Sequence, residues 1–346
     1  MSARALADPA TTPAPRDATE PPEARGLGRD EVRLLVAGRE ALEHTVFRRL
    51  DEFLDPGDLL VVNVSETLPA ALEGRRGSDA VGVHLSAPLD DGTWAVELRA
   101  ADRSGPLLDG HHGEVIDLAG GSRIEVVSAY FGVEGRSRML RVRPDMKEPV
   151  AGYLARFGRP ISYAYTRGDW PLAAYQTIFG REPGSAEMPS AARPFTDELV
   201  TDLVASGIVM APVLLHAGVS SLERGETPLP ERFRVPDATA RLVNHVRASG
   251  GRVVAVGTTV TRALETAADA GGVVRAASGW TDLVLGPQRR ARVVTGLITG
   301  WHPPEASHRA LLVAVAGDDL VARAYAAAEE ERYLWHEFGD SCLLLP

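Results

Sequence analysis

The chain has 346 residues, of which 45% are hydrophobic and 24% charged, and its formal net charge is −10. The length allows two domains and a large core, and the acidic balance argues against broad electrostatic binding of nucleic acid. No apolar run is long enough to span a bilayer. The single cysteine, Cys342, excludes an intramolecular disulfide and suits a reducing compartment. We therefore expect a cytoplasmic protein that does not associate with membranes.

The N-terminal residues 1–23 are rich in Pro and Ala and lack the apolar core of a signal peptide. This composition predicts a disordered tail. A helix is expected next, from about Thr45 to Leu54, and the apolar run Leu59–Val62 predicts a buried strand. Asn63 and Ser65 follow that strand, so we expect them at its carboxyl end.

Residues 70–145 have a different pattern, because short strand-like runs alternate with Gly- and Asp-rich turns and no convincing helix interrupts them. We interpret this segment as a small β-barrel domain inserted into an α/β domain. The α/β domain is then discontinuous and comprises residues 24–69 and 146–346. The pair His111–His112 lies in a turn of the insert without further ligand-type residues at metal spacing, so we expect a surface turn and no metal.

From residue 196 onward, predicted helices and strands alternate along the chain. The expected elements are a helix at Thr196–Gly207, a strand at Ile208–His216, a helix at Pro236–Gly251, strands at Trp280–Pro287 and Val293–Thr299, helices from about Glu305 and from Asp318 to about Trp335, and a strand at Ser341–Pro346. This alternation predicts an α/β fold with a mainly parallel, doubly wound sheet.

The most informative unit of this α/β pattern is a strand, a tight turn and a helix. Val253–Val256 predicts a strand buried on both faces, and Gly257 breaks it. Thr258 and Thr259 are expected to cap the following helix and to offer hydroxyls to a ligand, with Arg262 in its first turn. Ligands of open α/β sheets bind at the carboxyl ends of strands, often against a helix N-terminus. The alternative is an ordinary capped connection, for which the same residues suffice.

Other polar residues follow predicted strands and could converge with this turn if the strands are parallel. His216 and His302 are the candidates for proton transfer near neutral pH, although each could instead be a hydrogen-bonded structural histidine. Asn63 is a candidate ligand-binding residue. Tyr175 and Gln176 lie in a loop that could stack on a purine or simply pack. The usual glycine-rich nucleotide-binding motifs and the Gly-x-Ser-x-Gly motif of hydrolases are missing from the sequence.

Several motifs together resemble a known family. In order, these are DPGDLLVVN followed by LPAAL, then AYQTIFGREPGS, VLLHAG, VVAVGTTVTRALE, WTDLVLGP, GLITGWHPPEAS and ERYLWHEFGD. In order and spacing they are similar to the S-adenosylmethionine:tRNA ribosyltransferase-isomerases of queuosine biosynthesis, from about Pro22 to the C-terminus. The resemblance implies a discontinuous α/β domain with an inserted β-barrel.

The resemblance also implies a reaction, in which S-adenosylmethionine is a substrate and its ribosyl part is transferred to 7-aminomethyl-7-deazaguanine in tRNA. Adenine and methionine leave, and an epoxycyclopentanediol forms. This chemistry needs a base for the C5′ proton beside the sulfonium and an acid for the departing adenine, but no metal. The implied S-adenosylmethionine site comprises Asn63, Tyr175, Gln176, Gly257, Thr258, Thr259 and Arg262, with His216 and His302 as the catalytic candidates.

The chain departs from the family pattern mainly in predicted loops. Glu66 replaces an arginine, Pro194 replaces a histidine, and Thr227–Arg232 lacks two histidines of the family motif. Residues 219–226 replace the family's Gly-Thr-Phe continuation, and His302 is kept while a neighbouring asparagine is lost. Because function usually resides in loops, we expect a retained S-adenosylmethionine pocket with an altered acceptor, which makes tRNA a doubtful partner. The alternatives are a divergent enzyme with a small-molecule acceptor or none, and a catalytically silent nucleoside-binding protein. The sequence does not indicate the oligomeric state.

Overall fold

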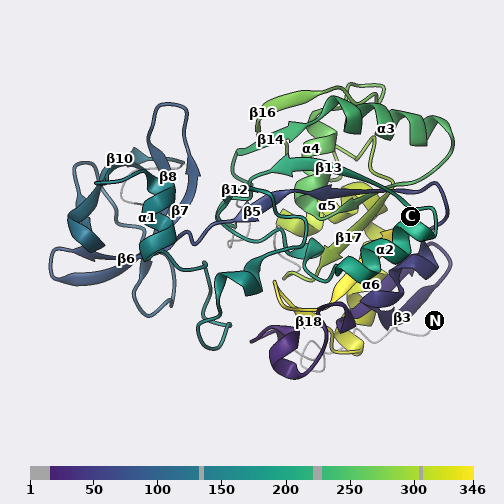
Figure 1. Cartoon of the computed structure of the whole chain (residues 1–346), viewed down its shortest axis with the longest axis horizontal. Coiled ribbons are helices and arrows are strands. Elements are labelled where there is room, and N and C mark those ends of the chain that lie inside the picture. Colours follow the sequence, from purple (N-terminus) through teal and green to yellow (C-terminus); the bar gives the residue numbers. More distant parts are fainter. Residues whose placement is uncertain (1–15, 132–135, 221–227, 304–306) are drawn as a thin grey trace, which may run out of the picture.

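The computed structural model describes residues 16–131, 136–220, 228–303 and 307–346. Within these residues the chain forms a large mixed sheet with helices on both faces, and a closed β-barrel stands to one side of it (Figure 1). The α/β fold with an inserted β-barrel is thus confirmed. No helix in the described ranges is both long enough and apolar enough to cross a membrane.

The large sheet has a parallel centre and mixed edges. Its strands, in spatial order, are β16 (Ala277–Thr281), β14 (Glu231–Val235), β13 (Val209–Leu215), β4 (Leu59–Asn63), β15 (Val253–Val256), β17 (Gly296–Gly300), β19 (Ser341–Leu345), β2 (Arg33–Gly38) and β3 (Leu42–Val46). β13, β4, β15 and β17 are parallel neighbours, whereas β14, β16 and β3 pair antiparallel at the two edges. β4 and β15 are buried along their whole length, as expected for apolar strands covered on both faces.

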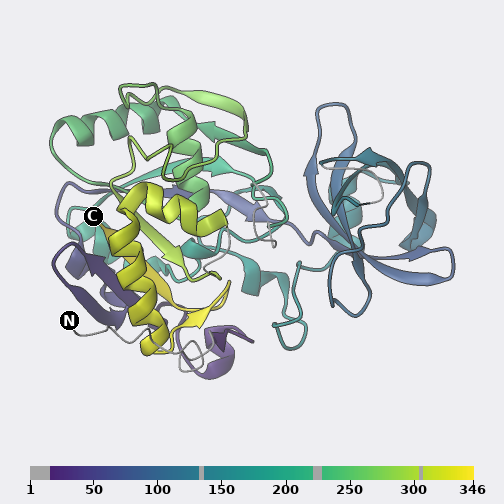
Figure 2. The same ribbon diagram turned by 180° about the vertical axis from the view of Figure 1, so that it is seen from behind.

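Helices cover both faces of this sheet, which makes it doubly wound. The α-helices of the described chain are α1 (Val150–Phe157), α2 (Asp197–Ala205), α3 (Asp237–Ala248), α4 (Thr258–Thr266), α5 (Ser307–Ala316) and α6 (Asp318–Glu330). Apolar residues of α3, α4, α5 and α6 share one core with one face of the strands. Residues of α2 and of the 3₁₀-helix η4 (Phe47–Phe53) share a second core with the opposite face. The view from behind shows α5 and α6 lying over the sheet (Figure 2).

The barrel is built from consecutive short strands. They are β6 (Ala71–Arg76), β7 (Asp79–Pro88), β8 (Trp94–Ala100), β9 (Val115–Leu118), β10 (Ser122–Ala129) and β11 (Met139–Asp145). Alternate apolar residues of these strands fill the interior, and Tyr153 and Leu154 of α1 pack against the same core. Two further pairs of short parallel strands lie outside the barrel and the large sheet. β1 (Arg16–Asp17) pairs with β18 (Leu334–Trp335), and β5 (Ser65–Thr67) pairs with β12 (Glu182–Ser185).

The helix expected from about Thr45 to Leu54 is present as the 3₁₀-helix η4, which begins only at Phe47 because the β-branched pair Thr45 and Val46 continues the edge strand β3. Two other local predictions were wrong. The strand expected at Trp280–Pro287 begins earlier, because β16 pairs with β14 through Ala277–Thr281. The last helix ends at Glu330 rather than near Trp335, which lies in β18.

The described part of the expected disordered tail is ordered. Arg16 and Asp17 form β1, and Ala18 is buried with its amide donating to the carbonyl oxygen of Trp335 at 3.0 Å. A 3₁₀-helix, η2, spans Pro22–Arg25. The local composition does not reveal this order, because the partners of the segment lie at the other end of the chain.

Candidate active site

A cavity of about 380 Å³ lies at the carboxyl ends of the central strands. Ala217 and Gly218 of its wall follow β13, Gly257 and Thr258 follow β15, and Thr299 lies near the end of β17. Parallel strands present their carboxyl ends at one edge of a sheet, which is where α/β proteins bind ligands. The cavity therefore lies at the edge predicted from the sequence.

The turn before α4 presents backbone and hydroxyl groups to this cavity. Gly257 has a φ of 97°, which favours glycine, and an added Cβ would lie 3.3 Å from the Cβ of Ala191. Gly257 itself is the N-cap residue, and no side chain caps the helix, so the expected caps by Thr258 and Thr259 are not formed. Both threonines line the cavity, and Thr259 Oγ1 accepts a 3.4 Å hydrogen bond from Asn63. The first amides of α4 have no intrahelical acceptor and can bind an electronegative ligand group.

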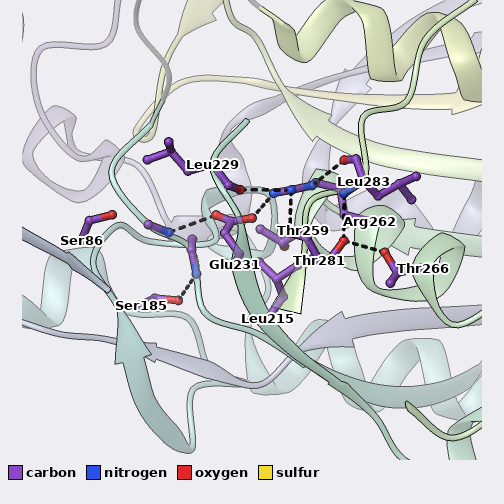
Figure 3. A network of polar contacts seen from close by, with 12 residues as sticks. Ser86, Ser185, Leu215, Leu229, Glu231, Thr259, Arg262, Thr266, Thr281 and Leu283 are labelled. Atoms are coloured by element: carbon purple, nitrogen blue, oxygen red, sulfur yellow. Dashed lines mark hydrogen bonds and ion pairs between the residues drawn. The ribbon is translucent and has the colours of Figure 1, made fainter. Parts of the chain in front are cut away.

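Arg262 lines the cavity, but its guanidinium is bound by the protein. It donates to the carbonyl oxygens of Leu229 (3.1 Å), Thr281 (3.2 Å) and Leu283 (3.1 Å) and forms an ion pair with Glu231 (Figure 3). These contacts hold the start of β14 and the segment after β16 against α4. The residue predicted to bind a ligand thus acts in this structure as an anchor of the cavity wall.

The partner of this arginine also joins two strand ends. Glu231 accepts a 3.0 Å hydrogen bond from the amide of Gly218, which follows β13. Burial raises the pKa of the Glu231 carboxyl, and the positive charge of Arg262 opposes that shift. The wall on this side of the cavity therefore depends on a buried charge pair.

Two imidazoles lie together near the end of β17. The rings of His302 and His308 are 3.9 Å apart between centroids, and His308 Nε2 is 3.0 Å from Thr299 Oγ1. Burial lowers the pKa of His302 well below its ordinary value, and the neighbouring His308 and His336 lower it further. Burial also lowers the pKa of His308 to about 4. Both rings are neutral at pH 7 and can accept a proton more readily than they can donate one.

Another part of the cavity wall carries aromatic and acidic groups that were not predicted from the sequence. Tyr163 donates to Glu187, and Tyr165 donates to Glu337 at 2.7 Å. The ring of His336 stacks on Tyr165 with centroids 4.1 Å apart and an interplanar angle of 12°. Burial raises the pKa of Glu337 and of both tyrosines. This wall thus brings two carboxylate–phenol pairs and an imidazole to one cavity.

His216, a predicted catalytic residue, does not line this cavity. Its Nδ1 is 2.7 Å from Ser65 Oγ, and its ring packs so tightly on Gly184 that an added Cβ would lie 2.3 Å from it. Burial lowers the pKa of the imidazole. These contacts join β5 and β12 to the end of β13.

Of the other predicted ligand residues, Tyr175 lines the cavity, whereas Asn63 and Gln176 do not. The Asn63 amide donates to the carbonyl oxygen of Leu215 at 2.8 Å and accepts from its N–H at 3.0 Å, which joins β4 to β13. Gln176 bonds both backbone groups of Thr67, at 3.0 and 2.8 Å. Both amides therefore brace the strands beneath the cavity.

The departures from the family pattern are distributed unevenly around the cavity. Pro228 and Leu229 form part of its wall, whereas Glu66 on β5 and Pro194 do not. Thr227 lies outside the described residues. Among the described residues no group of three or more His, Cys, Asp or Glu side chains is arranged to hold a metal ion.

One sequence signal could have revealed part of the missed wall. Ile161, Tyr163 and Tyr165 alternate with other residues and all line the cavity, as expected for an extended segment with one buried side. His336 and Glu337 carry no such signal, because they reach the cavity through the pairing of β18 with the N-terminal β1.

Comparison with known proteins identifies the family. Residues 11–344 match the family described as queuosine biosynthesis protein. The S-adenosylmethionine:tRNA ribosyltransferase-isomerase of Symbiobacterium thermophilum is 36% identical over 92% of this chain and 94% of its own length, and that of Acidiphilium cryptum is 37% identical over 96% of both chains. The crystal structure of S-adenosylmethionine tRNA ribosyltransferase from Thermotoga maritima covers 97% of this chain and 98% of its own, with a TM-score of 0.50 and 29% identity. The chain belongs to the S-adenosylmethionine:tRNA ribosyltransferase-isomerase family.

Proposed function

We propose that this chain uses S-adenosylmethionine as a ribosyl donor bound in the cavity, and that adenine and methionine leave during the reaction. The observation that carries the proposal is the cavity itself, with the glycine turn and open N-terminus of α4 on its wall. The donor itself is the one named for the relatives that match over nearly the whole chain, the S-adenosylmethionine:tRNA ribosyltransferase-isomerases.

The groups around the cavity suit the parts of that donor. The first amides of α4 and the hydroxyls of Thr258 and Thr259 can bond ribose hydroxyls or the methionine carboxylate. A sulfonium cation is attracted to aromatic faces and to carboxylates, and Tyr163, Tyr165 and Glu187, which also line the cavity, offer both. The lining thus provides partners for the carboxylate, the ribose hydroxyls and the sulfonium of one small molecule.

The proton transfers of this reaction fall to the imidazoles that line the cavity rather than to His216, which does not. His302 remains a catalytic candidate because it lines the cavity, but burial and the neighbouring imidazoles disfavour its protonated form, so it holds a transferred proton poorly. His216 has its Nδ1 beside Ser65 and supports the strand ends.

We further propose that the acceptor differs from the deazaguanine-bearing tRNA that the family resemblance implies. Pro228 and Leu229 replace part of a histidine-containing motif in the cavity wall, and Glu66 reverses a charge on the nearby β5. Glu187 and Glu337 add acidic groups to the same cavity. Carboxylates repel phosphate groups, so these walls suit a small acceptor without phosphates better than a nucleic acid.

Incubation with S-adenosylmethionine, followed by chromatography for adenine and methionine, tests the donor. We expect both products when an amine acceptor is supplied, and without one only at the rate at which water takes up the ribosyl group. A protein that binds S-adenosylmethionine and releases neither product under any condition would be the silent binding protein, and the proposed function would be wrong.

A second incubation adds tRNA that carries 7-aminomethyl-7-deazaguanine, and mass spectrometry follows the modified base. We expect the epoxycyclopentanediol adduct to form slowly or not at all. Rapid formation of the adduct would reject the altered acceptor while supporting the donor. Unmodified tRNA is the matched control, because it lacks the acceptor amine.

A further inference from the structure

The N-terminal strand β1 lies directly beside the site. It pairs in parallel with β18, in the register Arg16 to Leu334 and Asp17 to Trp335, and β18 immediately precedes His336. The segment is held at further points, since the amide of Arg167 donates to Thr19 at 2.7 Å. Figure 1 shows this N-terminal part next to the β18 label. Residues 16–19 therefore pack against β18 and the segment around Arg167, next to the part of the cavity wall that His336 forms.

Asp17 binds the imidazole of His336 directly. Its Oδ1 is 3.0 Å from His336 Nε2. An ionised carboxylate can only accept a hydrogen bond, so Nε2 carries the hydrogen and Nδ1 of the neutral ring carries the lone pair. Within the described ranges Nδ1 has no hydrogen-bond partner in the protein. The ring thus has its proton-accepting nitrogen available.

The position of His336 is fixed from several sides. Its φ of 69° lies in the left-handed region, which costs a non-glycine residue energy and is common at functional sites. Its amide donates to Trp301 and its carbonyl oxygen accepts from Gly339, both at 3.0 Å. The ring stacks on Tyr165 and faces His302 at 6.4 Å between centroids. His336 lines the cavity in this constrained conformation.

A base becomes a cation when it accepts a proton, so its neighbours decide whether it can act. His302 has two other imidazoles beside it, His308 and His336, and each of them disfavours its protonated form. His336 instead has the carboxylate of Asp17 bonded to it, which favours its protonated form and opposes the effect of burial. The environment of His336 is thus better suited to hold a transferred proton.

We infer that His336 is a catalytic base of this enzyme and that Asp17 is its positioning residue. This inference rests on the proposed function. In the step concerned, the C5′–H bond beside the sulfonium breaks, its proton forms an N–H bond at His336 Nδ1, and the electron pair stays on carbon as a sulfonium ylide. The resulting imidazolium is stabilised by Asp17 through the existing Nε2–H bond.

The test compares three variants with the wild type. His336→Gln keeps an amide that can donate to Asp17 but removes the base, and Asp17→Asn keeps an acceptor but removes the charge. His245→Gln is the matched control, because His245 is exposed in the last turn of α3. We expect His336→Gln to lower kcat/KM for adenine release by about 100-fold or more, with S-adenosylmethionine affinity little changed.

The pH dependence of kcat/KM in Asp17→Asn distinguishes a positioning role of Asp17 toward His336 from a purely structural one. Burial lowers the pKa of His336, whereas Asp17 raises it. Tyr165, Glu337 and His302 face the same ring and are unchanged in this variant. The loss of the charge therefore lowers the pKa further, and the acidic limb of kcat/KM moves to lower pH. The rate at neutral pH should fall by about 10-fold or more, because the tautomer is no longer fixed.

Nitrogen NMR of the imidazoles provides a readout that needs no activity. We expect His336 of the wild type to be protonated at Nε2 at neutral pH, and Asp17→Asn to lower its titration midpoint. If the wild type is active and His336→Gln keeps full kcat/KM, His336 is not the base. If NMR shows His336 protonated at Nδ1, Asp17 does not position it as inferred. If the wild type releases no adenine, the proposed function is wrong, and the assignment of His336 as a catalytic base is wrong with it.

Discussion

The substitution Arg262→Met tests whether this arginine anchors the cavity wall or binds ligand. It removes a buried guanidinium that forms an ion pair with Glu231 and three hydrogen bonds to backbone carbonyl oxygens. Removing one partner of a buried charge pair costs about 3–5 kcal/mol, because the other charge stays buried without compensation. The three carbonyls lose their donors as well, at about 1 kcal/mol each where water cannot reach them. We expect a loss of at least about 4 kcal/mol in the free energy of unfolding.

The assay is chemical denaturation of the wild type, Arg262→Met, Glu231→Gln and the double variant. The double variant should be more stable than the sum of the single effects predicts, by about 1–3 kcal/mol, since neither charge is then left alone. The pH dependence has a defined sign. Burial already raises the pKa of Glu231 above 4.5, and loss of Arg262 raises it further. The loss of stability caused by Arg262→Met should therefore be smallest below pH 4.5. It should grow as the pH rises through the pKa of Glu231 in the folded protein.

Arg241→Met is the control, because Arg241 forms an exposed pair with Asp237 on α3 and should be nearly neutral when replaced. If Arg262→Met is as stable as the wild type but no longer binds S-adenosylmethionine, Arg262 does not anchor the cavity wall. It then has the ligand-binding role that was predicted from the sequence. If the stability losses of Arg262→Met and Glu231→Gln add up to that of the double variant, the two side chains do not stabilise each other as a buried ion pair.

Three further predictions concern the turn and the barrel. Thr259→Val should weaken S-adenosylmethionine binding by about 1 kcal/mol or more in calorimetric titration. The control Thr201→Val, at an exposed position of α2, should leave binding unchanged. Gly257→Ala should cost about 1–2 kcal/mol of stability in denaturation, because its φ of 97° strains any side chain; an unchanged midpoint would show that the turn relaxes. Glu97→Gln should cost about 3–5 kcal/mol near neutral pH, since Glu97 is fully buried between arginines. Its pKa is lowered to about 2, so its stabilising effect is present above pH 4.5 and lost as pH falls through about 2, and a deficit independent of pH would contradict this account.

The sheet and the barrel could be predicted because their signals are local. Val253–Val256 and Leu59–Val62 are apolar throughout, which marks strands covered on both faces, and the turn-rich segment after residue 70 shows strand periodicity without a helix. The boundary between β3 and η4 could not be predicted in the same way. The apolar spacing around Phe47 indicates a helix, but only the pairing of β3 with β2 decides where the strand ends.

The site was predicted in outline, because polar residues after parallel strands must gather at one edge. Which of them face the cavity depends on contacts that the sequence does not show. Asn63 and His216 lie at strand ends, yet their polar groups bond Leu215 and Ser65 within the wall. His336 lies in the family-like motif ERYLWHEFGD but was not predicted as a site residue, because its left-handed backbone and its contacts with Tyr165 and Asp17 are not visible in the sequence.

The barrel contributes to this site rather than merely accompanying it. Arg99 of β8 lies over the ring of Tyr163 at 5.1 Å from its centroid and also bonds Glu97 at 2.9 Å. Ser86 of β7 accepts a 2.9 Å hydrogen bond from the amide of Val219, which follows β13. Both contacts reach residues of the cavity wall from strands of the barrel. Because the buried ion pair with Glu97 holds Arg99 in place, a change in the barrel core should alter the position of Tyr163, so the inserted domain takes part in shaping the cavity.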